Sequence, residues 1–199
     1  MSEPPIVVAI TGASGAPYAV RLLESLVHAR RRVQLIVSSH GLRLLDTELG
    51  IGSVDALAKK VGKDWDRYVA TFDDADRGAA PASGSALNDG MVICPCSMGT
   101  LSAIAHGSSR SLVERAADVM LKERRPLLLV PRETPLSAIH LENMLRVTRA
   151  GAVVMPAAPG FYHRPRSIDD LVNFVVARVL DHLGVKQDLV ARWGGDAAR

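Results

Sequence analysis

The feature that most constrains this chain is its alternation of short, continuously apolar runs with longer segments of helical periodicity. The runs cover residues 6–10, 33–37, 91–94, 126–130 and 152–155. Strands that are apolar at every position are buried on both faces, which is typical of a parallel sheet with helices on each side. The pattern predicts one doubly wound α/β domain, Rossmann-like or flavodoxin-like, over residues 1–183, with a polar C-terminal tail over 184–199.

The intervening segments predict the helices and one long loop. Helices are expected over 16–29, 40–49, 54–61, 97–106, 111–122, 135–149 and 167–183, and a weak strand over 67–70. A proline stands at the start of the helix expected from 135, where no N–H donor is needed. Ser167 is expected to cap the last helix. Residues 73–90 are rich in Asp, Ala, Gly and Ser, and a loop of this length in a compact domain is usually functional or disordered.

Charge and cysteine content exclude several classes of protein. The chain has 24 Lys and Arg against 21 Asp and Glu, an excess too small to argue for nucleic acid. Cys94 and Cys96 stand too close together for a mutual disulfide and have no nearby histidine pair, so we expect packing residues rather than a metal site or a nucleophile. No apolar run approaches the roughly 18 residues of a membrane span, and no signal peptide is evident. We therefore expect a cytoplasmic protein that binds neither membrane, nucleic acid nor metal.

The ligand site of such a fold lies at the carboxyl ends of the strands, close to the switch in strand order. This rule selects residues 11–15, 38–40, 95–100 and 131–134. The glycines of the first segment let backbone N–H groups approach a ligand, and the helix start that follows favours an anion. The segment lacks a P-loop lysine, and the second strand ends in Ser38, Ser39 and His40 rather than in the carboxylate expected for NAD. A mononucleotide such as FMN fits better, with an ordinary tight turn as the alternative.

Two further segments carry polar chemistry. Ser97 is expected to cap the helix over 98–106 and to leave free N–H groups there. Between residues 110 and 132 the cationic residues exceed the acidic ones by three, which equals the net charge of the whole chain, and we expect this segment to lie beside the site. Arg132 and Glu133 directly follow a strand, where a guanidinium suits an oxyanion and a carboxylate suits proton transfer. Arg115 and Lys122 share a helical face, and a solvated face is the alternative reading for both.

Five segments together resemble one known family. They are Ile10-Thr-Gly-Ala-Ser-Gly-Ala16 with Tyr18, Cys96-Ser-Met-Gly-Thr-Leu-Ser-Ala-Ile-Ala105, Arg115-Ala-Ala-Asp-Val-Met-Leu-Lys-Glu-Arg-Arg125, Leu129-Val-Pro-Arg-Glu-Thr-Pro135 and Met155-Pro-Ala-Ala-Pro-Gly-Phe-Tyr162. In this order, over roughly 6–183, they resemble the flavin prenyltransferases, the UbiX-type proteins. The resemblance implies joining of a dimethylallyl group from dimethylallyl monophosphate to N5 and C6 of reduced FMN, with release of phosphate and without a metal.

The resemblance also implies partners. The prenylated FMN would serve a partner decarboxylase in the ubiquinone or an aromatic-acid pathway. Members of the family form homo-oligomers, typically dodecamers, with their sites at subunit junctions. The sequence leaves open whether the donor is the monophosphate or the diphosphate.

Residue roles follow from position within the motifs. The resemblance implies that FMN is bound by Gly12, Ala13, Ser14, Ser39, Ser97, Met98, Gly99, Thr100 and Arg132. It implies that Tyr162 and Arg178 hold the prenyl phosphate, and that Trp193 closes over the site from the tail. Arg115 and Lys122 would reach a phosphate from a neighbouring subunit. Ser14, Glu48 and Glu133 are the expected catalytic residues, with Glu133 as the base or relay for the proton lost at C6.

Two alternatives remain open at this stage. Flavin-dependent cysteine decarboxylases share the fold, but they carry an early histidine base and a Pro-Ala-Ser-Ala-Asn-Thr motif. This chain has Pro81-Ala-Ser-Gly-Ser85 and no matching early histidine. The second alternative is a non-catalytic FMN carrier, such as a subunit of a decarboxylase. The run Ser108-Ser-Arg-Ser111 also departs from the family, in which Asn or Asp often precedes the Arg115 helix.

Overall fold

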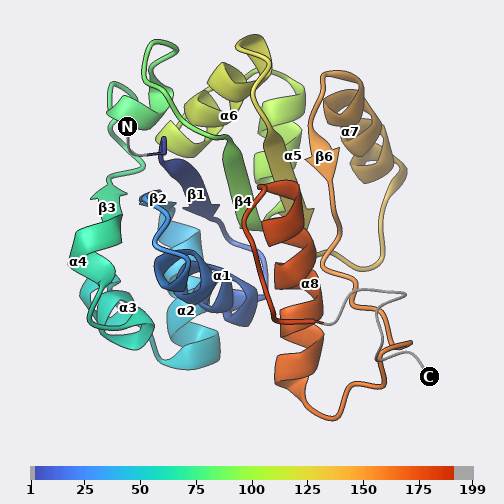
Figure 1. The fold of residues 1–199 in the computed structure, drawn as a ribbon. Coiled ribbons are helices and arrows are strands. Elements are labelled where there is room, and N and C mark those ends of the chain that lie inside the picture. The colour runs from blue at the N-terminus through green and yellow to red at the C-terminus, as the bar shows by residue number, and fades with distance from the viewer. Residues whose placement is uncertain (1–2, 191–199) are drawn as a thin grey trace.

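A six-stranded parallel sheet organises the computed structural model, which describes residues 3–190 (Figure 1). Its strands are β1 (Ile6–Ile10), β2 (Val33–Val37), β3 (Val69–Phe72), β4 (Met91–Cys96), β5 (Leu127–Pro131) and β6 (Val153–Val154). Their order is β3-β2-β1-β4-β5-β6. The chain fills the sheet outward from β1 on one side and then from β4 on the other, so the switch in strand order lies between these two strands. The predicted doubly wound α/β fold is confirmed.

Helices cover both faces of the sheet. They are α1 (Ala16–His28), α2 (Ser39–Leu49), α3 (Val54–Val61), α4 (Trp65–Tyr68), α5 (Met98–Ala105), α6 (Leu112–Lys122), α7 (Ala138–Arg149) and α8 (Ile168–His182), with a 3-10 turn, η1, at Ala80–Ala82.

The two faces of β1 belong to two separate hydrophobic cores. Ile6 and Val8 pack in the core that contains α1 and α8, whereas Val7 and Ala9 pack in the core that contains α5 and α6. Because both faces are buried, every position of the strand is apolar, which is the pattern that predicted a parallel sheet.

Three predicted boundaries are wrong. The strand expected over 67–70 begins at Val69, because the buried Trp65 anchors a short helix, α4, immediately before it. The helix expected from 135 begins at Ala138, because Ser137 caps it in a capping box with His140. The last strand covers only Val153–Val154.

Smaller differences concern strand ends and the tail. β4 continues to Cys96 through a register shift against β5 after Ile93, where Pro95 has no N–H to donate to a ladder. α2 begins at Ser39 rather than at residue 40, because Ser38 is its cap. Beyond the predicted boundary at 183, Val185 is 5% exposed and packs in the core of α1 and α8. Within the part of the chain that the structure describes, no helix has both the length and the apolar character to cross a membrane.

The contact between α2 and β1 depends on Gly41. A Cβ at this buried position would lie 2.4 Å from the carbonyl oxygen of Ile10 and 2.8 Å from its carbon. Both are backbone atoms of β1, so an alanine forces α2 away from the sheet. We expect Gly41→Ala to lower the free energy of unfolding by roughly 1–3 kcal/mol in a urea titration.

Gly78→Ala is the matched control. A Cβ there meets only the Oδ1 of Asp76, at 3.4 Å, which is ordinary contact. Its free energy of unfolding should stay within about 0.5 kcal/mol of the parent value. Equal stabilities for the two alanine variants would show that α2 tolerates a shift from β1.

Candidate functional site

The first loop and the start of α5 are tied together by Thr11, which directly follows β1. Its side chain is buried, and its hydroxyl donates to the carbonyl oxygen of Pro95 at 3.1 Å. The same hydroxyl accepts from the N–H of Ser97 at 2.8 Å. The loop of residues 12–15 and the segment 97–100 therefore lie side by side at the carboxyl edge of the sheet.

The amides at the start of α1 bind a carboxylate that the chain itself supplies. Glu48, in the last turn of α2, accepts from the N–H of Gly15 at 3.0 Å and of Ala16 at 2.8 Å. A helix N-terminus favours an anion, as predicted, but here the anion is an internal side chain. Glu48 thereby fixes the end of the loop that carries Ser14.

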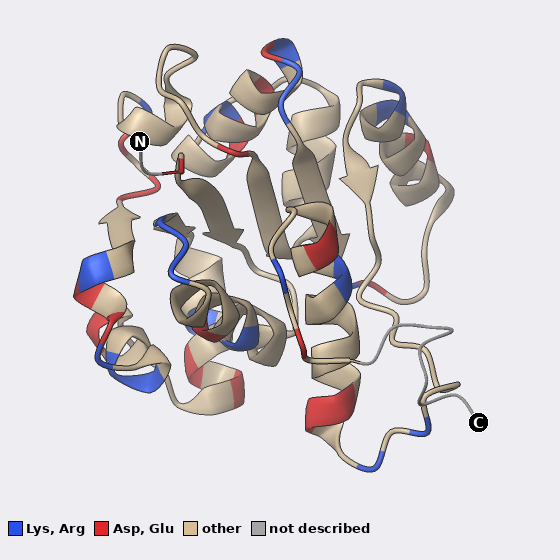
Figure 2. Cartoon of the chain, in the orientation of Figure 1, with Lys and Arg blue, Asp and Glu red and all other residues tan. Residues whose placement is uncertain are grey.

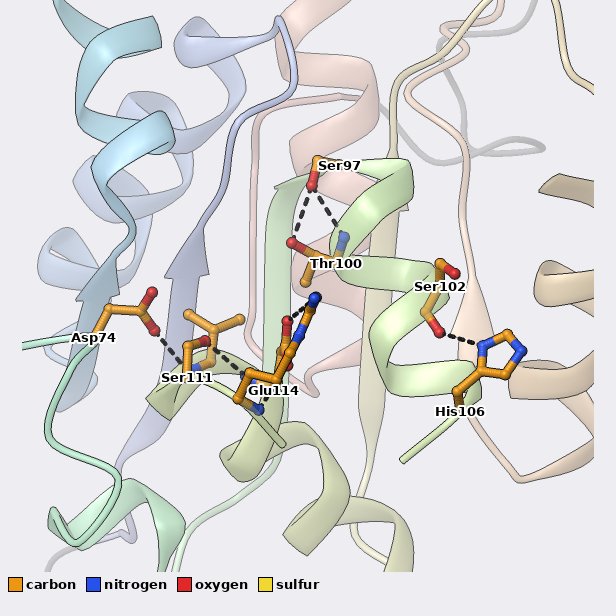
Figure 3. Close-up of polar contacts among 9 residues, drawn as sticks. Asp74, Ser97, Thr100, Ser102, His106, Ser111 and Glu114 are labelled. Carbon is orange, nitrogen blue, oxygen red and sulfur yellow. Dashed lines mark hydrogen bonds and ion pairs between the residues drawn. The ribbon is translucent and has the colours of Figure 1, made fainter. Parts of the chain in front are cut away.

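The start of α5 is open by contrast. Ser97 caps it as predicted, and its Oγ accepts from the N–H of Thr100 at 3.1 Å (Figure 3). The first backbone bond of the helix runs from Leu101 to the Ser97 carbonyl. The amides of Met98 and Gly99 precede that bond, so they are the ones left for a ligand. Gly99 is exposed, which keeps the approach clear.

The start of α2 borders the same edge. Ser38 caps this helix by accepting from the N–H of Gly41 at 3.0 Å. The predicted site residue Ser39 is exposed, and its hydroxyl lies 3.4 Å from Nδ1 of His40. A Cβ on Gly12 would lie 2.5 Å from the Cβ of His40, so only glycine lets the first loop approach α2 this closely.

Arg132 and Glu133 directly follow β5, and Arg132 reaches the first loop. The Nε of Arg132 donates to the carbonyl oxygen of Ser14 at 3.3 Å. Glu133 accepts from the N–H of Thr134 at 3.0 Å, and the side chains of Arg132 and Glu133 are both exposed. The structure therefore brings the predicted residues of the first loop, α2, α5 and β5 to one edge.

The segment after β6 reaches this edge as well. Met155 and Ala157 donate backbone bonds to Leu129 and Pro131, so the chain continues alongside β5 to its end. Tyr162, 63% exposed, lies edge-on to Phe174 of α8 with the ring centroids 5.6 Å apart. Arg178 follows Phe174 by four residues and so shares its helical face. Tyr162 and Arg178 thus lie along one surface of α8, where Arg178 also pairs with Asp181 at 3.4 Å.

His163 is a histidine of the segment after β6 that is partly buried. Its ring stacks on Phe174 at 5.1 Å, and both ring nitrogens are buried without a hydrogen-bond partner among the described residues. His106, by contrast, is exposed, and its Nδ1 lies 2.7 Å from the carbonyl oxygen of Ser102 (Figure 3).

The cationic segment 110–132 does not gather beside the site within one chain. α6 ends at Lys122, shortly before β5 begins, whereas Arg132 directly follows β5, so the two residues lie at opposite edges of the sheet. Figure 1 shows α6 and β5 in this arrangement, and Figure 2 shows charged residues on the loop between them. Lys122 pairs with Glu123, and Arg125 donates to the carbonyl oxygens of two residues of the 73–90 loop. Arg115 pairs with Asp118 at 2.8 Å. The expectation that the cationic residues of 110–132 gather beside the site is therefore wrong for a single chain. These residues are spread along α6 and the segments that flank it, and α6 runs from one edge of the sheet toward the other.

The long loop over 73–90 anchors α6. Asp74 accepts from the N–H of Val113 at 2.9 Å through its side chain and from that of Leu112 at 2.7 Å through its carbonyl (Figure 3). Beside it, the buried Glu114 accepts from Arg110 at 2.8 Å. Burial alone would raise the pKa of Glu114, but the hydrogen bonds and charge of Arg110 outweigh it and hold the pKa below its usual value.

The two cysteines lie in the core below the site. Both are fully buried, and burial raises the pKa of Cys94 to about 12 and that of Cys96 as well. Their thiols stay protonated at neutral pH, which fits packing residues rather than nucleophiles. Among residues 3–190, no group of three or more His, Cys, Asp or Glu side chains is placed to hold a metal. The predicted site residue Trp193 lies outside the described residues.

The sequence placed Thr11 and Ser38 in the segments selected for the site without indicating their roles, and it gave no sign of Gly41 and Asp74. Thr11 and Gly41 connect the loops and helices to β1, Ser38 caps α2, and Asp74 caps α6. Thr11 and Ser38 each follow an apolar strand directly, which was the available signal. Nothing local in the sequence indicated Gly41 or Asp74, because their partners are remote in the chain.

Comparison with known proteins identifies the family. A model of the Flavoprotein family matches residues 1–180. The flavin prenyltransferase UbiX of Pseudomonas aeruginosa is 51% identical over 195 residues, covering 95% of this chain and 93% of the relative. The flavin prenyltransferase UbiX of Methanocaldococcus jannaschii is 47% identical over 189 residues, covering 95% and 98%.

Solved structures agree with this assignment. The crystal structure of AnUbiX (PadA1) in complex with FMN and dimethylallyl pyrophosphate has a TM-score of 0.89 at 42% identity and covers 98% of this chain and 99% of that one. A dodecameric FMN-dependent UbiX-like decarboxylase from Escherichia coli O157:H7 has a TM-score of 0.86 at 42% identity, covering 96% and 99%. The cypemycin decarboxylase CypD, 16% identical with a TM-score of 0.59, shares the fold alone. The chain therefore belongs to the flavin prenyltransferase (UbiX) family of flavoproteins.

Proposed function

We propose that this protein joins the dimethylallyl group of dimethylallyl monophosphate to N5 and C6 of reduced FMN, with release of phosphate and without a metal. The observation that carries the proposal is the meeting of the first loop, the open start of α5 and Arg132 at one edge of the sheet. The names of the full-length relatives and the FMN complex of AnUbiX support it.

FMN would be held by the backbone and hydroxyl groups of three loops together with Arg132. The proposed contacts are Gly12, Ala13, Ser14, Ser39, Ser97, Met98, Gly99, Thr100 and Arg132. The donor set suits a flavin phosphate and its polar ring edge, since it offers helix-start amides, hydroxyls and one guanidinium. Because Glu48 binds the amides of Gly15 and Ala16, the helix-start amides proposed for FMN are those of Met98 and Gly99 in α5.

The prenyl phosphate would lie against Tyr162 and Arg178, with Arg115 and Lys122 supplied by a neighbouring subunit. Lys122 lies across the sheet from Arg132 in its own chain, so it needs a second copy to reach a shared site. The solved relative that is a dodecamer supports an assembly of this kind. Trp193 is proposed to close over the site on the family resemblance alone.

The reduced flavin, when bound, would be the nucleophile, and the residues at the site are suited to assist its attack on the prenyl donor. Loss of the allylic phosphate builds negative charge, which Lys122, Arg132 and Arg178 would stabilise. Holding both ligands in one pocket removes much of the entropic barrier. Ring closure consumes the prenyl double bond, which takes up one proton, and releases another from C6, for which Glu133 is the proposed base or relay, assisted by Ser14.

Glu48 stays a predicted catalytic residue. Its carboxylate is bound to two amides, so we propose that it also positions the loop that carries Ser14.

The product would pass to a partner decarboxylase, in ubiquinone or aromatic-acid metabolism, in the cytoplasm. Residues 1–183 would form the flavin-binding domain, and 184–199 its tail. The alternative of a non-catalytic FMN carrier becomes an outcome of the first experiment below.

The first test is direct conversion. Purified protein, FMN, reductant and dimethylallyl monophosphate should give a flavin whose mass rises by that of the prenyl group, as measured by mass spectrometry. Parallel reactions with the diphosphate establish which donor is used. FMN that binds but keeps its mass with either donor, while neither donor binds, would favour the carrier.

Glu133→Gln tests the proton transfer. We expect it to lower the turnover rate by about 10²–10⁴-fold, the usual contribution of a general base, with little change in the Kd for FMN. Glu142→Gln, an exposed carboxylate of α7, is the control and should turn over normally. An unchanged rate for Glu133→Gln would remove Glu133 from the mechanism.

Subunit complementation tests the shared site. Lys122→Ala and Arg132→Ala chains, each impaired alone, are coexpressed with different tags and purified through both tags. Mixed assemblies contain junctions with both native residues, so their activity should exceed that of either parent. Co-purified Lys122→Ala chains bearing the two tags are the control. Mixed assemblies no more active than the parents would place Lys122 outside the shared site.

A further inference from the structure

Thr11 is a buried polar residue at the switch between β1 and β4 that the proposed function does not use. It is 2% exposed, and with Glu114 and Asn143 it makes up the buried polar or charged residues of the described chain. Buried polar groups are costly unless they are hydrogen-bonded. What Thr11 binds therefore indicates what it does.

The hydroxyl of Thr11 connects β1 to the segment after β4 at a point where the backbone pairing of the two strands has ended. The pairing of β1 with β4 ends at Ala9 and Ile93, and from Ile93 onward β4 also shifts its register against β5. Beyond this point the Thr11 N–H donates to the carbonyl oxygen of Pro95 at 3.2 Å. Its hydroxyl donates to the same oxygen at 3.1 Å and accepts from the N–H of Ser97 at 2.8 Å.

The two segments that the Thr11 hydroxyl connects both contain residues of the proposed flavin site. Gly12, Ala13 and Ser14 follow Thr11 in the chain, while Ser97 caps α5 and precedes the open amides of Met98 and Gly99. The hydroxyl therefore fixes the separation of the two loops.

We propose that Thr11 is a positioning residue, whose hydroxyl sets the first loop and the start of α5 at the spacing at which both bind one flavin. This inference rests on the proposed binding of FMN at these loops. Thr11 itself does not touch the ligand, and it acts through the N–H of Ser97 and the carbonyl oxygen of Pro95. Removal of the hydroxyl leaves that part-buried N–H without its acceptor.

Thr11→Val, which keeps the shape and removes the hydroxyl, tests the proposal against Thr11→Ser, which keeps the hydroxyl. In a fluorescence titration of the full-length protein, the Kd for FMN should rise about tenfold in Thr11→Val and stay within about twofold of the parent in Thr11→Ser. Thr148→Val is the matched control. It removes a threonine hydroxyl bonded to the carbonyl oxygen of Met144 at 2.8 Å in α7, and its Kd should be unchanged.

Thermal unfolding separates positioning from packing. A Thr11→Val protein with a lower Tm but a parental Kd for FMN in its folded fraction would overturn the proposal, as would a Thr11→Ser variant as weak as Thr11→Val. If Thr11→Val does not fold, Thr11→Ala takes its place in the comparison with Thr11→Ser. A parent chain that fails to bind FMN overturns the proposed function and this inference together. A parent that binds FMN while all variants match it overturns this inference alone.

Discussion

The switch in strand order between β1 and β4 is the constraint on which the rest of the site depends. The chain leaves β1 toward α1 in one core and leaves β4 toward α5 in the other, so the two loops diverge across opposite faces of the sheet. Divergence creates room for a ligand at the carboxyl edge. It also removes the ladder that would hold the loops together, and the bonds of Thr11 to Pro95 and Ser97 restore the connection where the ladder ends.

The same edge collects the starts of α1, α2 and α5, all of which favour anions. The side chain that binds the first amides differs among these three helices. Glu48 occupies the start of α1, which stabilises the fold and leaves no free amide at Gly15 or Ala16. Ser38 and Ser97 cap α2 and α5 with neutral hydroxyls, so the positive ends of these helices keep their charge for a ligand. The proposed position of the flavin phosphate follows from this difference rather than from the glycine-rich loop alone.

The sequence predicted the fold well because burial on both faces leaves a pattern in every strand, and the family motifs supplied the site residues. It failed where a distant contact decides the local structure. Trp65 starts a helix where a strand was expected, because its ring reaches the core. The charges from Arg110 to Arg132 adjoin in sequence but not in space. α6 places Lys122 about 16 Å from its own start, at 1.5 Å per residue over 11 residues, and β5 then separates Lys122 from Arg132.

That separation explains why one chain does not complete the proposed site. Arg132 lies with Ser14 at the carboxyl edge, whereas Lys122 lies at the other edge beside Glu123. Residues that are distant within a subunit meet in a symmetric assembly when different edges of neighbouring copies face each other. The outer surface of α7 fits such packing, since Leu141 and Leu145 are 53% and 50% exposed one helical turn apart. Apolar surface of this kind is stabilised by burial against another copy, which fits the assembly that the proposed shared site requires.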